Sequence, residues 1–295
     1  MNDSVVHEDG RMGPVAIGGV GGSGTRVVAE IISRAGLYLG DDLNDAMDDL
    51  WFNLLFYRPS WFLTGAARRR DAIHTGLDLM AKRSRGSRRL SFSEARFLVE
   101  ALADIPRNGF SRTWALHRLL AFGRSPGTRK GKFVGWGWKE PSTHLILEEL
   151  LNHSEHSMYV HVVRHGLDMS FSSNLNQVRR FGPLFGVQLS SSVPLPVSAL
   201  RYWIESNRRA VDIMRRRAPE RTLIVRFDEL CESPESEVRR LLRFLHMEPG
   251  RTELRELVSL PRAPASAGRY RAHDLAMFAG KEIEAVREFG FEVQL

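Results

Sequence analysis

With 295 residues, 43% of them hydrophobic, the chain is long enough to bury one substantial core, and we expect a single domain over residues 1–295. No apolar run is long enough to span a bilayer, and the polar, acidic N-terminus does not resemble a signal peptide, so the sequence predicts a cytoplasmic protein without a transmembrane segment. The single cysteine, Cys231, excludes an internal disulfide, and no group of Cys and His residues has metal-ligand spacing, so we expect no metal.

Basic residues outnumber acidic ones by 42 to 35, and much of the surplus lies in two runs, Arg68–Arg70 and Lys82–Arg89. Such runs suit anionic partners, and they are equally compatible with a solvated helix face followed by a loop. The second run has no aromatic residues among its basic ones, and the chain carries no recognised nucleic-acid-binding motif. We therefore expect no nucleic-acid partner.

The chain begins with the pattern of a strand, a glycine-rich turn and a helix. Residues 15–20 form a short apolar run, Gly21 and Gly22 break it, and residues 25–35 carry apolar side chains at helical spacing. From residue 41 to about 123 the pattern is helical, and no strand signal interrupts it. The sequence therefore predicts a helical insertion at about 41–125, where a substrate-binding cap is common.

Strand patterns return in the second half of the chain, at residues 132–136, 158–163 and 222–227, and helical stretches follow them at 142–151, 167–178 and 235–245. Residues 182–197 are rich in Ser and Pro and predict a loop. Strands that alternate with helices favour a parallel sheet with right-handed crossovers. The predicted fold class is α/β, a P-loop-like three-layer fold with a central, mostly parallel sheet flanked by helices and a helical substrate-binding insertion.

Glycines are dense where the first predicted strand turns into the first helix, in Gly18-Gly19-Val20-Gly21-Gly22-Ser23-Gly24-Thr25-Arg26. Backbone N–H groups at the start of a helix form a cradle for phosphate; the alternative is that the glycines only make a tight turn. A Walker A loop needs a lysine after its last glycine, so a magnesium-ATP kinase is disfavoured, and a Rossmann fingerprint lacks its acidic ribose-binding residue. The candidate nucleotide-binding residues are Gly21, Gly22, Ser23, Gly24, Thr25 and Arg26.

Arg164 ends the predicted strand 158–163, and Ser172 follows it on the next predicted helix. A dianionic phosphate is bound well by a fixed guanidinium and a hydroxyl donor, and Arg and Ser at this separation can converge on one oxyanion. The alternative for Arg164 is a surface salt bridge.

These two segments resemble the PAPS-dependent sulfotransferase superfamily, in its bacterial and Golgi-type branches, where PAPS is 3'-phosphoadenosine 5'-phosphosulfate. Gly22-Ser23-Gly24-Thr25 is similar to the superfamily's loop of a basic residue followed by Ser-Gly-Thr, which holds the 5'-phosphosulfate. Arg164 and Ser172 are similar to the Arg and Ser that grip the 3'-phosphate, and Asp168 stands where the superfamily usually has Asp.

Weaker likenesses follow in the correct order along the chain. Trp138-Lys139-Glu140-Pro141 resembles a Lys-x-Pro segment, and residues 225–230 with Phe244-Leu245 resemble the Tyr-Glu-Asp-Leu and Phe-Leu-Gly stretches. The segment that contains Gly268 and Arg269 is similar to a late loop that folds back on the nucleotide, and the last helix with Phe289-Gly290-Phe291 matches the usual ending. The resemblance covers about residues 14–295 except the helical middle.

The resemblance implies a sulfotransferase that moves the sulfuryl group of PAPS to a hydroxyl or amine and releases PAP, without a metal. Sulfuryl transfer needs a cation near the leaving phosphate oxygen. The superfamily usually places Lys or Arg directly before Ser-Gly-Thr, and this chain has Gly22 there. Lys139 is the favoured substitute and Arg26 the other. The missing cation leaves a catalytically inactive nucleotide- or glycan-binding protein as the main alternative, and a P-loop kinase as a weaker one.

The acceptor must lose a proton to a base. Asp48 stands where glycan- and tyrosine-modifying members carry an acidic base, although an acidic helix start that faces water is an equal alternative. The other candidates are Asp41, Asp42, Asp45, Asp49, His144 and His165. The basic run in the helical middle suggests an anionic saccharide or glycolipid as the acceptor.

Overall fold

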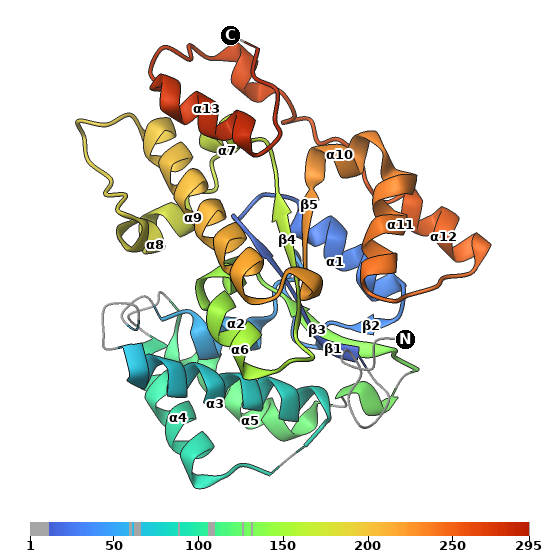
Figure 1. Cartoon of the computed structure of the whole chain (residues 1–295). Helices are drawn as coiled ribbons and strands as arrows, with labels where there is room; N and C mark the ends of the chain where they lie inside the picture. The colour runs from blue at the N-terminus through green and yellow to red at the C-terminus, as the bar shows by residue number, and fades with distance from the viewer. Residues whose placement is uncertain are drawn as a thin grey trace.

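In the part of the chain that the structure describes, five strands form one sheet, which runs through the centre of the molecule in the order β2-β3-β1-β4-β5 (Figure 1). The computed structural model describes residues 12–58, 61, 66–87, 89–105, 110–125, 127–130 and 132–294. The strands are β1 (Met12–Gly19), β2 (Leu37–Tyr38), β3 (Gly135–Lys139), β4 (Met158–Val163) and β5 (Thr222–Arg226). All four pairings between them are parallel, so the predicted fold class is confirmed.

Helices cover both faces of the sheet and form the outer layers (Figure 1). They are α1 (Thr25–Arg34), α2 (Leu50–Phe56), α3 (Ala66–Ser84), α4 (Phe92–Asp104), α5 (Arg112–Ala121), α6 (Leu147–His153), α7 (Gly166–Ser170), α8 (Asn176–Phe181), α9 (Leu195–Arg217), α10 (Phe227–Glu232), α11 (Pro234–Phe244), α12 (Arg251–Val258) and α13 (Gly280–Glu288). Short 3-10 helices are η4 (Phe122–Arg124), η5 (Gly127–Lys130), η6 (Pro141–Ile146), η7 (Gly182–Phe185), η8 (Pro219–Arg221) and η9 (Arg269–Ala272).

Alternation along the strands divides the core between the two faces of the sheet. On β1, Val15 and Ile17 pack with α1, α10, α11 and α12, whereas Ala16 packs with α2–α6 and the second half of α9. Trp136 and Trp138 of β3 face the same way as Ala16. Successive side chains of a strand point to opposite faces, so a central strand that is buried on both faces is apolar throughout. The first half of α9 packs with α7, α8 and α13 in a third cluster.

Most predicted elements are confirmed within a few residues, including β4, β5, α1 and α11. The prediction for β3 was displaced: the strand lies at Gly135–Lys139 and not at 132–136, because pairing with β1 sets its position. The strand β2 was missed, since two residues carry no recognisable alternation. The predicted helical stretch from 41 to about 123 contains α2, α3, α4 and α5, and its residues 59–60, 62–65, 88 and 106–109 lie outside the described ones.

The predicted helix 167–178 is wrong, because the chain forms two short helices, α7 and α8, with a break at residues 171–175. Side chains in this region bond to the backbone and compete with helix continuation: Ser170 Oγ donates to the Leu167 carbonyl over 2.7 Å, and Ser172 Oγ accepts from the Asn174 N–H over 3.1 Å. The predicted loop 182–197 contains η7 and ends where α9 begins at Leu195, since proline is tolerated in the first turn of a helix. The length of α9 was not predicted.

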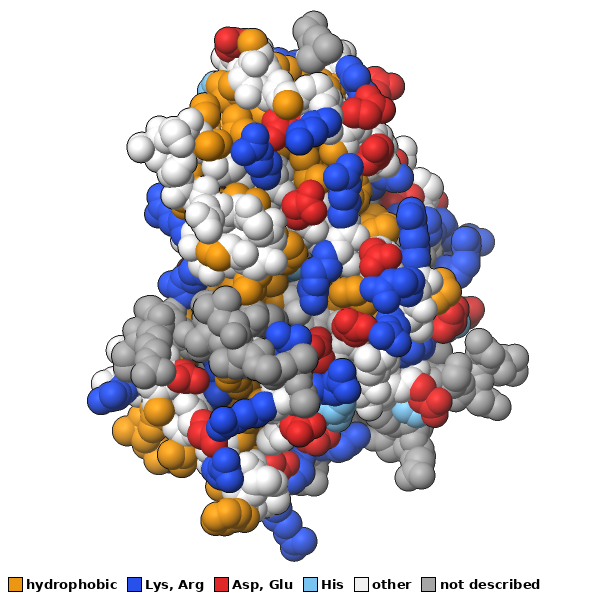
Figure 2. Space-filling model, turned by 60° about the vertical axis from the view of Figure 1, so that its left-hand side comes forward, with side chains coloured by type: hydrophobic (Ala, Val, Ile, Leu, Met, Phe, Trp, Pro, Cys, Tyr) orange, Lys and Arg blue, Asp and Glu red, His pale blue; other side chains and the backbone are white. Residues whose placement is uncertain are grey.

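The helices α2, α3, α4 and α5 lie between β2 and β3 in the chain and gather at the lower end of the molecule in Figure 1. The face drawn in Figure 2 carries many Lys and Arg side chains, and a group of hydrophobic side chains stands out at its lower end. Among the described residues, each helix is too short or too polar to cross a membrane.

Candidate active site

The glycine-rich loop connects β1 to α1 at the carboxyl edge of the sheet. The Ser23 N–H donates to the Val20 carbonyl over 3.0 Å, and Gly22 and Gly24 both have φ of +97°, a conformation that favours glycine. The hydroxyl of Ser23 is buried and makes no hydrogen bond with the described residues. A buried hydroxyl without a partner beside the start of a helix suits an anionic ligand. Arg26 is exposed on the first turn of α1.

Gly24 is required for a second reason, which the sequence did not reveal. A Cβ atom at this position would lie 2.1 Å from the ring of Phe227 at the start of α10. The loop and the start of α10 are therefore packed in direct contact, with the Phe227 ring against the backbone of Gly24. Sequence reasoning noted Phe227 only as part of a family stretch.

Arg164 lies at the same edge of the sheet as the loop, because β1 and β4 are adjacent parallel strands. Gly19 pairs with Val162, so the two chains leave the sheet side by side. The guanidinium carbon of Arg164 is 6.0 Å from the centre of the Phe227 ring, the same ring that contacts Gly24. Burial lowers the pKa of Arg164, against the opposing effect of Asp168 and Asp228. Arginine nevertheless stays charged, and its Nε is buried without a partner among the described residues.

The late loop around Gly268 folds back onto Arg164. Arg164 donates to Ser266 Oγ over 2.9 Å, and the Asp168 carboxylate accepts the N–H of Gly268 over 2.7 Å and that of Tyr270 over 3.2 Å. Arg269 donates to the Phe171 carbonyl over 3.3 Å, which ties it to the segment after α7. The two segments are about a hundred residues apart in the sequence, and Asp168 is the group that joins them.

Ser172 does not lie on a helix, contrary to the prediction, because α7 ends at Ser170. Its hydroxyl instead accepts the Asn174 N–H in the turn that follows. The eight residues from Arg164 to Ser172 therefore span one short helix, α7, and the turn after it. Ser172 directly follows Phe171, whose carbonyl accepts a hydrogen bond from Arg269.

Lys139 and Asp48, predicted separately as the cation and the base, form an ion pair. Lys139 ends β3 with a side chain that is 2% exposed, and Asp48 is 19% exposed. The Lys139 ammonium also donates to the Ala46 carbonyl over 2.9 Å, and Asn44 donates to the other oxygen of Asp48 over 2.9 Å. Lys139 pairs in register with Ile17 of β1, two residues before β1 ends at Gly19. The pair therefore lies at the carboxyl edge of the sheet, where the glycine-rich loop also lies.

Three of the other four aspartates of the cluster, Asp41, Asp42 and Asp49, have structural partners. Asp41 pairs with Arg83 and Asp42 with Arg118, and Asp45 is exposed. Asp49 caps α2 by accepting the N–H groups of Trp51 and Phe52 over 2.8 and 2.9 Å, and burial raises its pKa to about 6. Of these carboxylates, Asp48 is the one that meets Lys139.

Glu140 is a buried carboxyl that sequence reasoning passed over. It follows Lys139 directly, its N–H donates to the Ile17 carbonyl over 3.1 Å, and its side chain accepts the Ser142 N–H at the start of η6. Burial, reinforced by the charge of Asp48, raises the pKa of Glu140 to about 8. A carboxyl in this state holds a proton at neutral pH and stands close to the predicted base.

Gln177 of α8 joins the glycine-rich loop to the segment that follows Lys139. Its Oε1 accepts the Gly21 N–H over 3.0 Å, and its Nε2 donates to Ser142 Oγ over 3.1 Å. No pattern in the sequence pointed to this residue. The contact links the loop after β1, the segment after β3 and α8, so the three segments are held in a fixed relation.

A cluster of aromatic side chains connects the helical insertion with α8. Tyr57, after α2, stacks edge-on against Phe110 and Phe181, and the guanidinium of Arg180 lies 4.9 Å from its ring centre. Phe110 stacks on Trp114 of α5 with ring centres 4.4 Å apart. Burial raises the pKa of Tyr57 to about 12.

The two reserve histidines are placed differently. His144, on η6, is buried with both ring nitrogens unpartnered among the described residues, and burial lowers its pKa well below the ordinary value. The His165 ring stacks on Tyr270 with ring centres 4.6 Å apart, and the backbone N–H of His165 donates to the Asp228 carboxylate over 3.1 Å. His165 therefore belongs to the Arg164 side and His144 to the Lys139 side.

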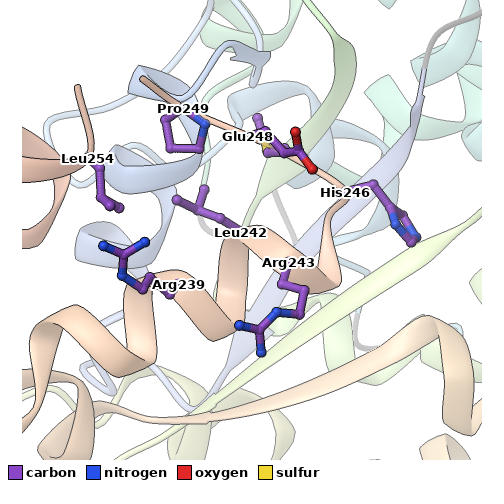
Figure 3. Close-up of a pocket in the computed structure, with 8 residues that line it drawn as sticks. Arg239, Leu242, Arg243, His246, Glu248, Pro249 and Leu254 are labelled. Carbon is purple, nitrogen blue, oxygen red and sulfur yellow. The ribbon is translucent and has the colours of Figure 1, made fainter. Parts of the chain in front are cut away.

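A separate hollow of about 390 Å³ lies between α11 and α12, away from all of these residues (Figure 3). Its lining includes Arg239, Leu242, Arg243, His246 and Leu254. Because none of the predicted site residues lines it, the candidate active site remains the carboxyl edge of β1, β3 and β4.

The chain is similar to one known protein family and to several solved structures. A model of the sulfotransferase family matches residues 14–250. Similar solved structures include the sulfotransferase domain of the Synechococcus olefin synthase, 16% identical with a TM-score of 0.48 over 98% of each chain. The sulfotransferase domain from the curacin biosynthetic pathway is 14% identical with a TM-score of 0.48, over 96% of this chain and 100% of that one. Sulfotransferase STF1 from Mycobacterium tuberculosis is 16% identical with a TM-score of 0.43, over 83% of this chain and 70% of that one. No curated protein sequence matches the chain.

Proposed function

The chain belongs to the sulfotransferase family, and we propose that it transfers a sulfuryl group from PAPS to a hydroxyl or amine of an acceptor, releasing PAP. One observation carries this proposal: the glycine-rich loop and Arg164 leave adjacent parallel strands at the same edge of the sheet, and the Phe227 ring lies beside both of them. A nucleotide with a phosphate at each end of its ribose can be held by two such elements only when they lie close together.

The residues at this edge suit a nucleotide that carries two anionic groups. The N–H groups of Gly22, Gly24 and Thr25 and the unpartnered hydroxyl of Ser23 would hold the 5'-phosphosulfate. The N–H groups of Gly21 and Ser23 already donate to Gln177 and to the Val20 carbonyl, and they fix the shape of the loop. Arg164 and Arg269 would hold the 3'-phosphate, and Ser172 would contribute from the turn after α7. Gly268 would position the late loop through its N–H, which donates to Asp168. Bound PAPS supplies a sulfuryl group whose bond to the 5'-phosphate oxygen is the one that breaks.

Lys139 is the better candidate for the cation that Gly22 does not provide. Its ammonium is buried beside the end of β1, whereas Arg26 is exposed on the outside of α1. Lys139 would neutralise the charge that develops on the leaving phosphate oxygen, and Asp48 would accept the proton that the acceptor loses as its oxygen or nitrogen bonds to sulfur. The ion pair between Lys139 and Asp48 would fix the positions of both side chains.

The acceptor side of the site would be formed by the insertion at about 41–125 within one domain. Tyr57, Phe110 and Trp114 provide aromatic surfaces, and Arg180 adds a positive charge beside them. Aromatic rings next to a guanidinium suit a saccharide that carries negative charge. We accordingly include an anionic saccharide or glycolipid as the proposed acceptor class.

A catalytically inactive nucleotide-binding protein is the second candidate function. It is favoured by one specific observation: the cation position of the loop is Gly22, and Lys139, the buried cation at the end of β3, is paired with Asp48. Transfer of label from radiolabelled PAPS to a panel of glycans, glycolipids and phenols separates the two candidates, because the inactive protein would bind the nucleotide and label nothing.

Calorimetry tests the donor assignment. We expect the chain to bind PAP. The Arg164→Ala variant should bind PAP roughly ten- to a hundredfold more weakly, since a hydrogen bond to a charged group contributes about 1.5–3 kcal/mol. Arg164→Lys keeps the charge and should recover only part of the loss. Arg243→Ala, an exposed arginine near the α11–α12 hollow, is the matched control and should bind as the parent does. Binding of ATP with magnesium, with no binding of PAP, would instead indicate a kinase and overturn the proposal.

A further inference from the structure

Large apolar side chains are exposed mainly on one part of the insertion. Among the described residues, five of the nine such side chains lie at residues 90–120: Phe92 is 87% exposed, Leu120 68%, Val99 67%, Leu116 48% and Leu90 40%. A globular surface normally carries such residues singly, and a concentration of them marks an interaction site. We call Leu90, Phe92, Val99, Leu116 and Leu120 the α4–α5 face.

The exposed residues follow the helical repeat and are not remnants of the core. Phe92 and Val99 are two turns apart on α4, while Phe97, Leu98 and Ala101 point inward and are buried. Leu116 and Leu120 are one turn apart on α5, where Ala115 points inward. Each helix thus has an apolar inner side that packs against the protein and a second apolar stripe on its outer side.

Charge around the α4–α5 face is positive. Residues 66–125 contain thirteen Lys and Arg against five Asp and Glu. The exposed charged side chains from residue 85 to 124 are, among the described residues, Arg85, Arg89, Arg96, Arg112, Arg124 and one acid, Glu100. Glu94 and Asp104 are less exposed and lie in ion pairs with Lys82 and Arg58.

The apolar and basic residues are interspersed on the same stripes. Arg96 lies between Phe92 and Val99 on the outer side of α4, and Arg112 lies one turn before Leu116 on α5. A helix surface that mixes large apolar side chains with arginines can insert the former among acyl chains while the latter meet anionic headgroups. A second copy of the chain is disfavoured as the occupant, because it would bring arginines against arginines.

From the exposure, the spacing and the charge of these residues, we propose that the α4–α5 face docks the protein peripherally on an anionic lipid bilayer. This binding goes beyond the proposed sulfotransferase function and does not depend on it. Phe110 packs against Tyr57 and Trp114 stacks on Phe110, and both belong to the segment that carries the face, so docking would bring the acceptor side of the site toward the membrane.

Vesicle sedimentation of the full chain tests the proposal. The protein should bind vesicles of phosphatidylcholine with 30% phosphatidylglycerol and not vesicles of phosphatidylcholine alone, and the binding should weaken with added salt. Arg89→Gln with Arg112→Gln should weaken it about fivefold for each arginine. Phe92→Gln with Leu120→Gln should weaken it about tenfold or more for each side chain. Met277→Gln, which removes an apolar side chain that is 38% exposed outside the insertion, is the matched control and should bind as the parent does.

The outcomes separate this proposal from its alternatives. Calorimetry with PAP should give the same affinity for the Phe92→Gln, Leu120→Gln variant as for the parent, so loss of vesicle binding with retained PAP binding supports docking. Absence of binding to the anionic vesicles, or equal binding to neutral and anionic vesicles, would overturn it. A concentration-dependent dimer that the double apolar variant abolishes would assign the face to self-association, and capture of an acidic protein without vesicle binding would assign it to a protein partner; either result also overturns it.

Discussion

Replacement of Lys139 by Met separates a catalytic role of this residue from a structural one. Met keeps most of the length and apolar volume of the lysine side chain, and it removes the ammonium that contacts Asp48 and the Ala46 carbonyl. We expect two effects of different origin, one on folding stability and one on the rate of transfer.

The loss of stability should be moderate. Removing one partner of a buried ion pair costs about 3–5 kcal/mol when the remaining charge has no solvent. Asp48 is 19% exposed and keeps the hydrogen bond from Asn44, so we expect about 2 kcal/mol for Lys139→Met. Lys139→Met with Asp48→Asn removes both charges and should regain part of that loss. Urea unfolding of the parent, both single variants and the double variant measures this coupling.

The loss of activity should be larger and should not return with stability. A group that neutralises the leaving oxygen contributes about 3 kcal/mol to the barrier, so kcat should fall by about a hundredfold or more in Lys139→Met. The assay is label transfer from PAPS to the best acceptor of the panel, with PAP affinity measured in parallel. If Lys139→Met unfolds more easily and yet transfers sulfate within threefold of the parent rate, Lys139 is only the partner of Asp48 and our assignment of the cation is wrong.

Two further changes test the loop and the buried carboxyl. Gly24→Ala should destabilise the fold by about 3 kcal/mol or more and abolish PAP binding, because the residue has φ of +97° and its Cβ would meet the Phe227 ring at 2.1 Å. Gly250→Ala is the control, since Gly250 has φ of −62° and open space around it. Equal unfolding curves for the two variants would contradict this account. Glu140 has a pKa of about 8 when folded and about 4.5 when unfolded, so the folded state binds the extra proton and stability should fall by about 1.4 kcal/mol per pH unit as the pH rises from about 5 to 8. Glu140→Gln should remove that fall, and an unchanged pH profile of the unfolding free energy in this variant would show that Glu140 does not titrate in this range.

The fold class was accessible from the sequence because it depends on local patterns. The apolar runs of β4 and β5 and the helical repeats of α1 and α11 are each encoded within a few neighbouring residues. The strand β2 and the break between α7 and α8 escaped this approach. Two residues are too few to show a period, and the break depends on hydroxyl groups that bond to nearby backbone.

The candidate site was accessible only in part. The glycine-rich loop and Arg164 carry motifs, so they could be named in advance, whereas Gln177, Phe227 and Glu140 have no distinctive spacing. Their place in the site follows from contacts between segments that are far apart in the chain.

By itself, the sequence determined the alternation of strands and helices, the glycine-rich turn and the residue types available for anion binding, since periodicity and side-chain chemistry are properties of the local chain. Only the tertiary structure decided that Lys139 meets Asp48 and that the late loop closes on Arg164. Strand order and register brought these groups together, and both are set by packing across the whole core.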